Sequence, residues 1–128
     1  MFTLEQIDDI HDRLGSQDTV PQYLRALNAI GVERSDSFIA DGHSEHSGKG
    51  GETVVTPPTH EALTIAVTSS RDGLLEQLAL HGQGKTSYLE MSKGLARSGV
   101  AKWSFDTAAL TIAYYDKAGN ELLVETVS

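Results

Sequence analysis

The chain has 128 residues, of which 39% are hydrophobic and 22% charged, and this length and composition predict one globular domain over residues 1–128. It contains no cysteine, which excludes disulfides, thiolate nucleophiles and cysteine-based zinc sites. The net charge of −8 falls mostly on the N-terminal half of the chain, where acidic side chains far outnumber basic ones, and this sign disfavours nucleic acid and anionic membranes as partners.

The first helix is predicted over Leu4–Leu14. Thr3 and Gln6 have the spacing of a capping box, in which two side chains bind backbone N–H groups that the first turn leaves free. The apolar residues that follow recur at helical intervals, and Gly15 suits the left-handed position that commonly ends a helix.

A second helix is predicted over Val20–Ile30 by the same kind of pattern. Thr19 and Gln22 again have capping-box spacing, a proline lies in the first turn, where it is tolerated, and the apolar stripe ends at Gly31. Because a short polar segment joins the two helices, we expect them to pack as a helical hairpin.

A strand hairpin is predicted next, with strands over residues 37–40 and 53–56. The segment between them is polar and rich in glycine and histidine, so we expect a long or mobile connection there. The two prolines at 57 and 58 end this hairpin, because proline cannot donate a hydrogen bond to a sheet.

One more strand and two more helices are predicted in the middle of the chain. Apolar residues alternate with threonine and alanine over residues 63–67, which is the pattern of a half-buried strand. A serine cap opens a helix that runs to His81, and a capping box of Ser87 and Glu90 opens another that runs to Ser98.

Three strands are predicted after the last helix, as an antiparallel meander. They cover Val100–Phe105, Leu110–Tyr115 and Glu121–Val127, which are short, rich in aromatic or β-branched residues and separated by turn residues. Asp116 and Gly119 suit a type I turn with a glycine bulge. The sequence as a whole predicts a single α+β domain, with about four helices packed on a largely antiparallel sheet.

A short internal echo links the ends of two predicted helices. Residues 27–34 and 95–102 both run from a helix end through a glycine and an apolar residue to a cation. The match is brief and loose, so two ordinary glycine caps are the simpler interpretation, and an internal duplication is the alternative.

An ordered series of short motifs carries a resemblance to a known family. The series contains Gly31-Val32, Asp41-Gly42, His81-Gly82-Gln83-Gly84 followed by Tyr88, Ala96 with Gly99-Val100 and Trp103, and Tyr114-Tyr115-Asp116 with Gly119 and Glu125. Together these motifs resemble the YbcV-like group of small uncharacterised bacterial proteins, which are often labelled phage envelope proteins. The resemblance covers most of the chain and implies an α+β domain with an antiparallel sheet, without an established activity or catalytic residues.

Three histidines form a candidate metal site. His43 and His46 are flanked by Asp41 and Glu45 and followed by His60, and imidazole and carboxylate groups are ligands for zinc, nickel or manganese. On a strand, His46 would point away from the other side chains, so tetrahedral ligation would need a turn. A polar exposed loop is therefore the favoured interpretation of this segment, and metal binding is the alternative.

A group of basic and aromatic residues is the candidate interaction surface. Lys93, Arg97 and Lys102 lie close in sequence to Trp103 and Tyr88, and these residue types are common at protein interfaces. The same aromatic residues are also typical of a core, so the cations beside them are the more specific indication.

The sequence favours a non-catalytic binding or protein-interaction module, with a metal-binding protein or metal-dependent enzyme as the alternative. No serine lies in a nucleophile elbow, and the Gly-Lys-Thr of residues 84–86 lacks the first glycine of a phosphate-binding loop, so we predict no catalytic residue and no cofactor. An unidentified protein or a second copy of the chain is the expected partner. The N-terminus lacks the regions of a signal peptide, and no apolar run is long enough to span a membrane, which predicts a cytoplasmic protein.

Overall fold

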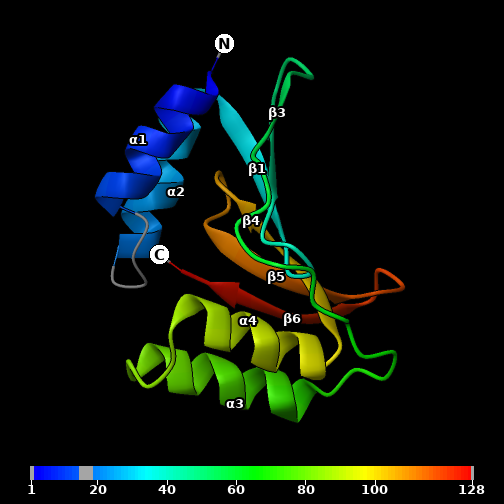
Figure 1. The fold of residues 1–128 in the computed structure, drawn as a ribbon. Coiled ribbons are helices and arrows are strands. Elements are labelled where there is room, and N and C mark those ends of the chain that lie inside the picture. The colour runs from blue at the N-terminus through cyan, green and yellow to red at the C-terminus, as the bar shows by residue number, and fades with distance from the viewer. Residues whose placement is uncertain (1, 15–18, 128) are drawn as a thin grey trace.

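Two similar blocks, each of two helices followed by three strands, make up the fold (Figure 1). A computed structural model describes residues 2–14 and 19–127. The first block contains α1 (Leu4–Leu14), α2 (Val20–Ala29), β1 (Val32–Phe38), β2 (Ser44–Gly48) and β3 (Thr53–Val55). The second contains α3 (Arg71–Gly82), α4 (Tyr88–Arg97), β4 (Val100–Asp106), β5 (Thr111–Asp116) and β6 (Glu121–Thr126).

The strands form one antiparallel sheet in the order β3-β2-β1-β4-β5-β6, so the two blocks meet where β1 pairs with β4. Both helix pairs lie on the same side of this sheet (Figure 1). The prediction of a single α+β fold with four helices and a C-terminal meander is confirmed. None of the helices in the described part of the chain is long and apolar enough to cross a membrane.

Two of the three predicted capping boxes are present. The backbone N–H of Thr3 donates to Gln6 Oε1 at 2.9 Å, and the N–H of Gln6 donates to Thr3 Oγ1 at 3.2 Å. Ser87 and Glu90 make the same reciprocal pair, at 3.0 and 3.1 Å. These contacts satisfy N–H groups that the first turn of a helix leaves without partners, and they start α1 and α4 where predicted.

The third predicted capping box is wrong. The side chain of Thr19 makes no capping hydrogen bond to α2, and its hydroxyl donates instead to the carbonyl of Leu14 at 2.6 Å. This bond ties the start of α2 to the end of α1. The predicted glycine cap at Gly15 lies outside the described residues.

The strands of the first block differ most from the prediction. The strand expected over residues 37–40 is β1, which begins earlier and is longer, and the polar segment expected to be a connection contains β2. Residues 63–67 form no strand, because their hydrogen bonds go elsewhere: the N–H of Leu63 donates to the carbonyl of Ala40, and that of Ala66 to the carbonyl of Ala96. Ile65 is nevertheless buried.

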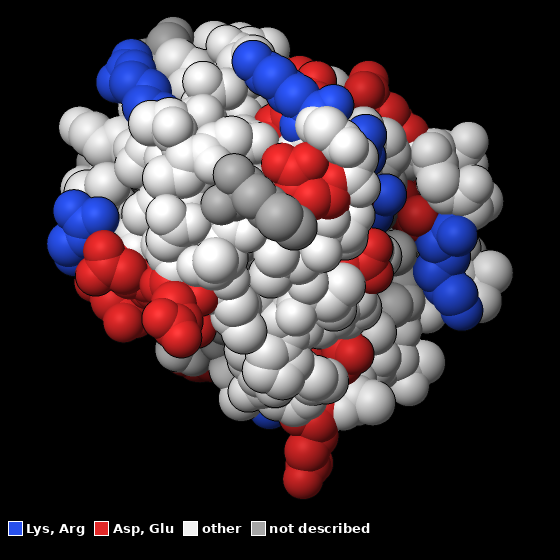
Figure 2. Space-filling model, turned by 90° about the horizontal axis from the view of Figure 1, so that it is seen from above, with Lys and Arg blue, Asp and Glu red and all other residues white. Residues whose placement is uncertain are grey.

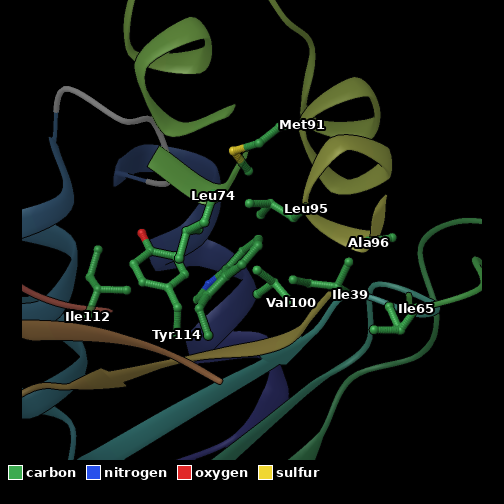
Figure 3. Close-up of a cluster of buried hydrophobic side chains, with 10 residues drawn as sticks. Ile39, Ile65, Leu74, Met91, Leu95, Ala96, Val100, Ile112 and Tyr114 are labelled. Carbon is green, nitrogen blue, oxygen red and sulfur yellow. The ribbon is translucent and has the colours of Figure 1, made fainter. Parts of the chain in front are cut away.

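Each helix pair covers its own apolar cluster on the sheet. Under α1 and α2 the buried residues are Phe2, Ile7, Ile10, Tyr23, Leu24, Leu27 and Val32. Under α3 and α4 they are Ile39, Ile65, Leu74, Met91, Leu95, Ala96, Val100, Trp103, Ile112 and Tyr114 (Figure 3). Trp103 is therefore a core residue, in keeping with the default expected for a large aromatic side chain.

The two blocks are copies of one structural unit that recurs along the chain. Helices α2 and α4 start at Val20 and Tyr88 and have the same length, and strands β1 and β4 start at Val32 and Val100 and are also equally long. The number of residues between the start of an element and the start of its counterpart in the other block is the same for β3 and β6, and one fewer for α1 and α3 and for β2 and β5. The short echo seen in the sequence is thus part of a repeat of the whole unit, in which the glycines that end α2 and α4 lie at equivalent positions.

The same interval governs the strand register. In the first unit Val32 pairs with Gly48 and Arg34 with Ser47, with an irregularity between the two pairs. In the second unit the equivalent residues pair in the same way, Val100 with Asp116 and Lys102 with Tyr115, again with the irregularity. An irregularity of this kind bends a strand and increases its twist, so the two halves of the sheet share one local shape.

The repeat also explains an unusual backbone conformation. Leu110 has φ of 57°, a backbone value that residues other than glycine rarely adopt. Its counterpart is Gly42, with φ of 77°, and each N–H donates at 2.9 Å to a carbonyl one helical turn earlier, that of Asp106 or of Phe38. The two turns therefore have one backbone shape, which glycine adopts without strain and leucine does not.

The equivalent glycines that end α2 and α4 provide a test of this packing. Gly31 and Gly99 have φ of 103° and 80°, so alanine at either position costs about 1–2 kcal/mol of unfolding free energy from backbone strain. An added Cβ at Gly99 would lie 2.5 Å from Cα of Ser69, whereas one at Gly31 would find only a Phe2 ring atom, at 3.9 Å. We expect Gly99→Ala to lose at least about 2 kcal/mol more than Gly31→Ala in urea unfolding. Equal losses would contradict close packing of the Thr68-Ser69 backbone on the end of α4.

Candidate functional site

The face of the sheet opposite the helices is the candidate functional site. Because side chains alternate along a strand, the register places one set under the helices and the other set on a face that none of the described helices covers. We call this the open face. Its residues in the four central strands are Arg34, Asp36, Phe38, Glu45, Ser47, Lys102, Ser104, Asp106, Thr111, Ala113 and Tyr115.

A single carboxylate lies at the centre of the open face. Asp36 accepts a hydrogen bond from Ser104 Oγ at 2.5 Å and from Arg34 Nε at 2.9 Å. Nζ of Lys102 lies 3.9 Å from its other oxygen. The Asp36 side chain is only 18% exposed, so these cations act on it with less screening than a fully exposed pair would have. One acid from β1 thus joins two cations from different strands.

Aromatic rings surround this centre. The Lys102 ammonium lies 5.3 Å from the centroid of the Tyr115 ring and 5.8 Å from that of Phe38, distances at which a cation is attracted to a ring face. Phe38 stacks in turn on His43, with ring centroids 4.4 Å apart and planes 1° from parallel. Flat apolar groups and charged groups are therefore interleaved across the face.

His43 lies between two carboxylates at the edge of the open face. Its Nδ1 is 2.5 Å from Asp41 Oδ1 and its Nε2 is 3.2 Å from Glu45 Oε2. Burial alone would lower the pKa of His43, but the hydrogen bonds to Asp41 and Glu45 outweigh it and raise that pKa above its ordinary value. Backbone and side-chain hydrogen bonds from His43 lower the pKa of Asp41. Asp41, His43 and Glu45 thus form one hydrogen-bonded cluster of ionisable side chains.

Two shallow hollows flank the central carboxylate. One has a volume of about 350 Å³ and is lined by Arg34, Tyr115 and their neighbours. The other has about 310 Å³ and is lined by Lys102, Phe38 and the turn at residues 116–119. Since Arg34 and Lys102 are equivalent in the repeat, the hollows lie at related positions in the two units.

The structure does not bring the three predicted metal ligands together. His46 points to the helix side, where it is 3% exposed and shares a hydrogen bond of 2.6 Å with Ser35 Oγ, while His43 lies on the open face. His60 Nδ1 is bonded to the carbonyl of Glu61 at 2.8 Å. Over residues 2–14 and 19–127, no three His, Asp or Glu side chains are grouped so as to hold a metal ion.

The predicted interaction residues divide between the two sides of the sheet. Tyr88 contacts Trp103 edge to face, with centroids 6.1 Å apart, on the helix side. Lys93 and Arg97 are exposed on α4, whereas Lys102 lies on the open face. Sequence reasoning identified Lys102 but missed Arg34, Asp36, Ser104 and Tyr115, the residues that surround it.

The charged side chains are dispersed on the side shown in Figure 2. Seen from above, the molecule carries small separate groups of acidic and basic residues around a broad area of other residues. This side therefore offers no continuous field of one sign with which to attract a polymer of the opposite charge.

The buried Ser35–His46 pair predicts a loss of stability in acid. Burial lowers the pKa of His46 to about 4, from 6.5 in the unfolded chain. Between pH 6.5 and 4 the unfolded chain therefore binds a proton that the folded protein does not, and stability falls as the pH falls. The total loss from this residue is about 3 kcal/mol.

Urea unfolding at several pH values measures this effect. We expect His46→Gln to be less stable than the wild type at neutral pH but to lose less stability between pH 6.5 and 4. The matched variant Ser35→Ala removes the hydrogen-bond partner but keeps the buried imidazole, so it should keep most of the wild-type loss of unfolding free energy between pH 6.5 and 4. If the unfolding free energies of the wild type and His46→Gln fell equally between pH 6.5 and 4, His46 would not be held neutral by burial.

Comparison with known proteins places the whole architecture in one family. A family model described as "Protein of unknown function (DUF1398)" matches residues 8–126, which include both structural units. A search of curated proteins gave no match. The family match supports the resemblance to uncharacterised proteins, while the YbcV-like and phage-envelope labels stay predictions. Because the match covers nearly the full length, the chain belongs to the DUF1398 family of proteins of unknown function.

Proposed function

We propose that this protein is a non-catalytic binding module whose ligand binds on the open face of the sheet. One observation carries the proposal: the helices cover one face only, and the opposite face presents aromatic rings and cations around a half-buried carboxylate. A sheet face that is only exposed to solvent would not need these aromatic rings. Aromatic groups supply contact area, and fixed polar groups orient a ligand.

The pairing of the charged groups favours binding over catalysis. Asp36 is already bonded to Ser104 and Arg34, and His43 is held by two carboxylates. A general base needs an acceptor that can reach a substrate proton. At the centre of the face, Oδ1 of Asp36 already accepts two hydrogen bonds, and its Oδ2 lies beside the Lys102 ammonium. The rigid strands beneath them suit a preorganised binding surface.

We also propose that the protein is cytoplasmic. A chain without cysteine is suited to the reducing cytoplasm, where disulfides do not contribute to stability. A protein partner is a second class of ligand for the open face, and a second copy of the chain is one such partner. The cations Lys93 and Arg97 on α4 stay a predicted interaction surface on the other side.

Two tyrosines on opposite sides of the sheet provide a matched test. We expect small aromatic compounds, titrated into ¹⁵N-labelled protein, to shift the amide resonances of β1, β4 and β5. Tyr115→Ala should weaken this binding at least about 10-fold, because the Tyr115 ring forms part of the open face. Tyr88→Ala, on the helix side, should leave it unchanged. The opposite pattern would move the binding surface to α4 and Trp103.

A further inference from the structure

The hollow beside Arg34 has the chemistry of an anion site. Arg34 uses Nε to bind Asp36, and among the described residues no acceptor is hydrogen-bonded to its two terminal nitrogens. Its side chain is 48% exposed, so these nitrogens are accessible to a ligand. A guanidinium group presents its N–H donors in a planar fork that matches the two oxygens of a carboxylate. Asp36 holds the base of this fork in place.

Two hydroxyl groups line the same hollow. Ser47 on β2 and Tyr115 on β5 lie on either side of the β1–β4 pair, and both line the hollow with Arg34. Ser104 also lines it, but its hydroxyl already donates to Asp36. The hollow therefore offers a cationic fork and two hydroxyl donors to one ligand.

The charges around the hollow limit the ligand to a single negative charge. Asp36 accepts a hydrogen bond from Arg34, and Glu33 and Asp106 line the hollow. Asp106 uses one oxygen to accept hydrogen bonds from the N–H groups of Ala108 and Ala109, which fix the position of its carboxylate. A phosphate dianion would meet these three acids with one arginine to compensate, whereas a carboxylate brings half that charge.

The body of the ligand is set by the apolar part of the hollow. The Tyr115 ring and Ala113 lie beside the polar groups, and the volume of about 350 Å³ is at the lower end of the range for small-molecule sites. A flat ring can stack on Tyr115 while its carboxylate reaches Arg34. A compound the size of benzoate fits both requirements.

The repeat distinguishes this hollow from its counterpart. Lys102 is the equivalent of Arg34, but its ammonium lies between the rings of Phe38 and Tyr115 and near Asp36. Its donors are directed to groups of the protein itself. Arg34 is thus the cation of the pair with donors left for a ligand.

We propose that the Arg34 hollow binds a small aromatic monocarboxylate, with Arg34 as the anchor, Ser47 and Tyr115 as hydroxyl donors, and the Tyr115 ring as the stacking surface. This proposal rests on the proposed function, because it places the ligand on the open face. It adds the chemical class of that ligand and the residue that selects it.

The test compares benzoate with benzamide, which has the same ring but no charge. When benzoate is titrated into ¹⁵N-labelled protein, we expect it to shift the amide resonances of Ser47, Ser104 and Ala113. The dissociation constant should be about 1–10 mM, which is typical of so small a ligand. Benzamide should bind at least about 10-fold more weakly. Arg34→Gln should weaken benzoate binding by a similar factor, and Arg25→Gln, which removes an exposed arginine from α2, should not change it.

Four results would overturn this assignment alone. They are equal binding of benzoate and benzamide, unchanged benzoate affinity in Arg34→Gln, tighter binding of inorganic phosphate than of benzoate, and benzoate shifts confined to the hollow beside Lys102. In the last case the open face remains the binding surface and only the Arg34 site fails. Shifts confined to α3 and α4 would remove both proposals. Amide spectra of each variant without ligand establish that it is folded.

Discussion

The pairing of β1 with β4 is the interaction on which the rest of the structure depends. It joins two ααβββ units through a run of residue pairs, from Arg34–Asp106 to Phe38–Lys102, and turns two three-stranded meanders into one sheet. The middle pair is Asp36 and Ser104, which occupy equivalent positions in the two units, so a local twofold axis passes between them. A twofold axis perpendicular to a sheet keeps both helix pairs on the same side. The open face is therefore a consequence of how the units are joined.

The sequence departs from symmetry where symmetry would be costly. Two aspartates facing each other on this axis would repel each other. With serine at one of the two positions, the pair becomes a hydrogen bond, and the equivalent cations Arg34 and Lys102 share one carboxylate. The electrostatic centre of the open face thus arises from divergence between the units at a single pair of positions, while the backbone around it stays the same.

Local signals in the sequence predict some of these elements and hide others. Capping residues and apolar periodicity define the helices, and aromatic and β-branched residues identify the last three strands. The first part of β1 and the whole of β2 are not predicted, because their covered face carries Ser35 and His46, which satisfy each other by a hydrogen bond instead of presenting an apolar stripe. The repeat is equally hidden. Ser35 and His46 correspond to Trp103 and Tyr114, which pair across β4 and β5 in the same register and have no chemical likeness to them.

The candidate site is harder to predict than the fold, because its residues come from strands far apart in the sequence. Lys102 and Trp103 are adjacent in the chain and look like one basic and aromatic surface, yet alternation along β4 sends them to opposite faces. The partners of Lys102 are instead Asp36 and Phe38, brought to it by the β1–β4 register. Thus the same pairing that joins the two units also assembles the open-face cluster, and a change that shifted β4 by a single position against β1 would turn Lys102 toward the core, away from Asp36, and Trp103 toward solvent.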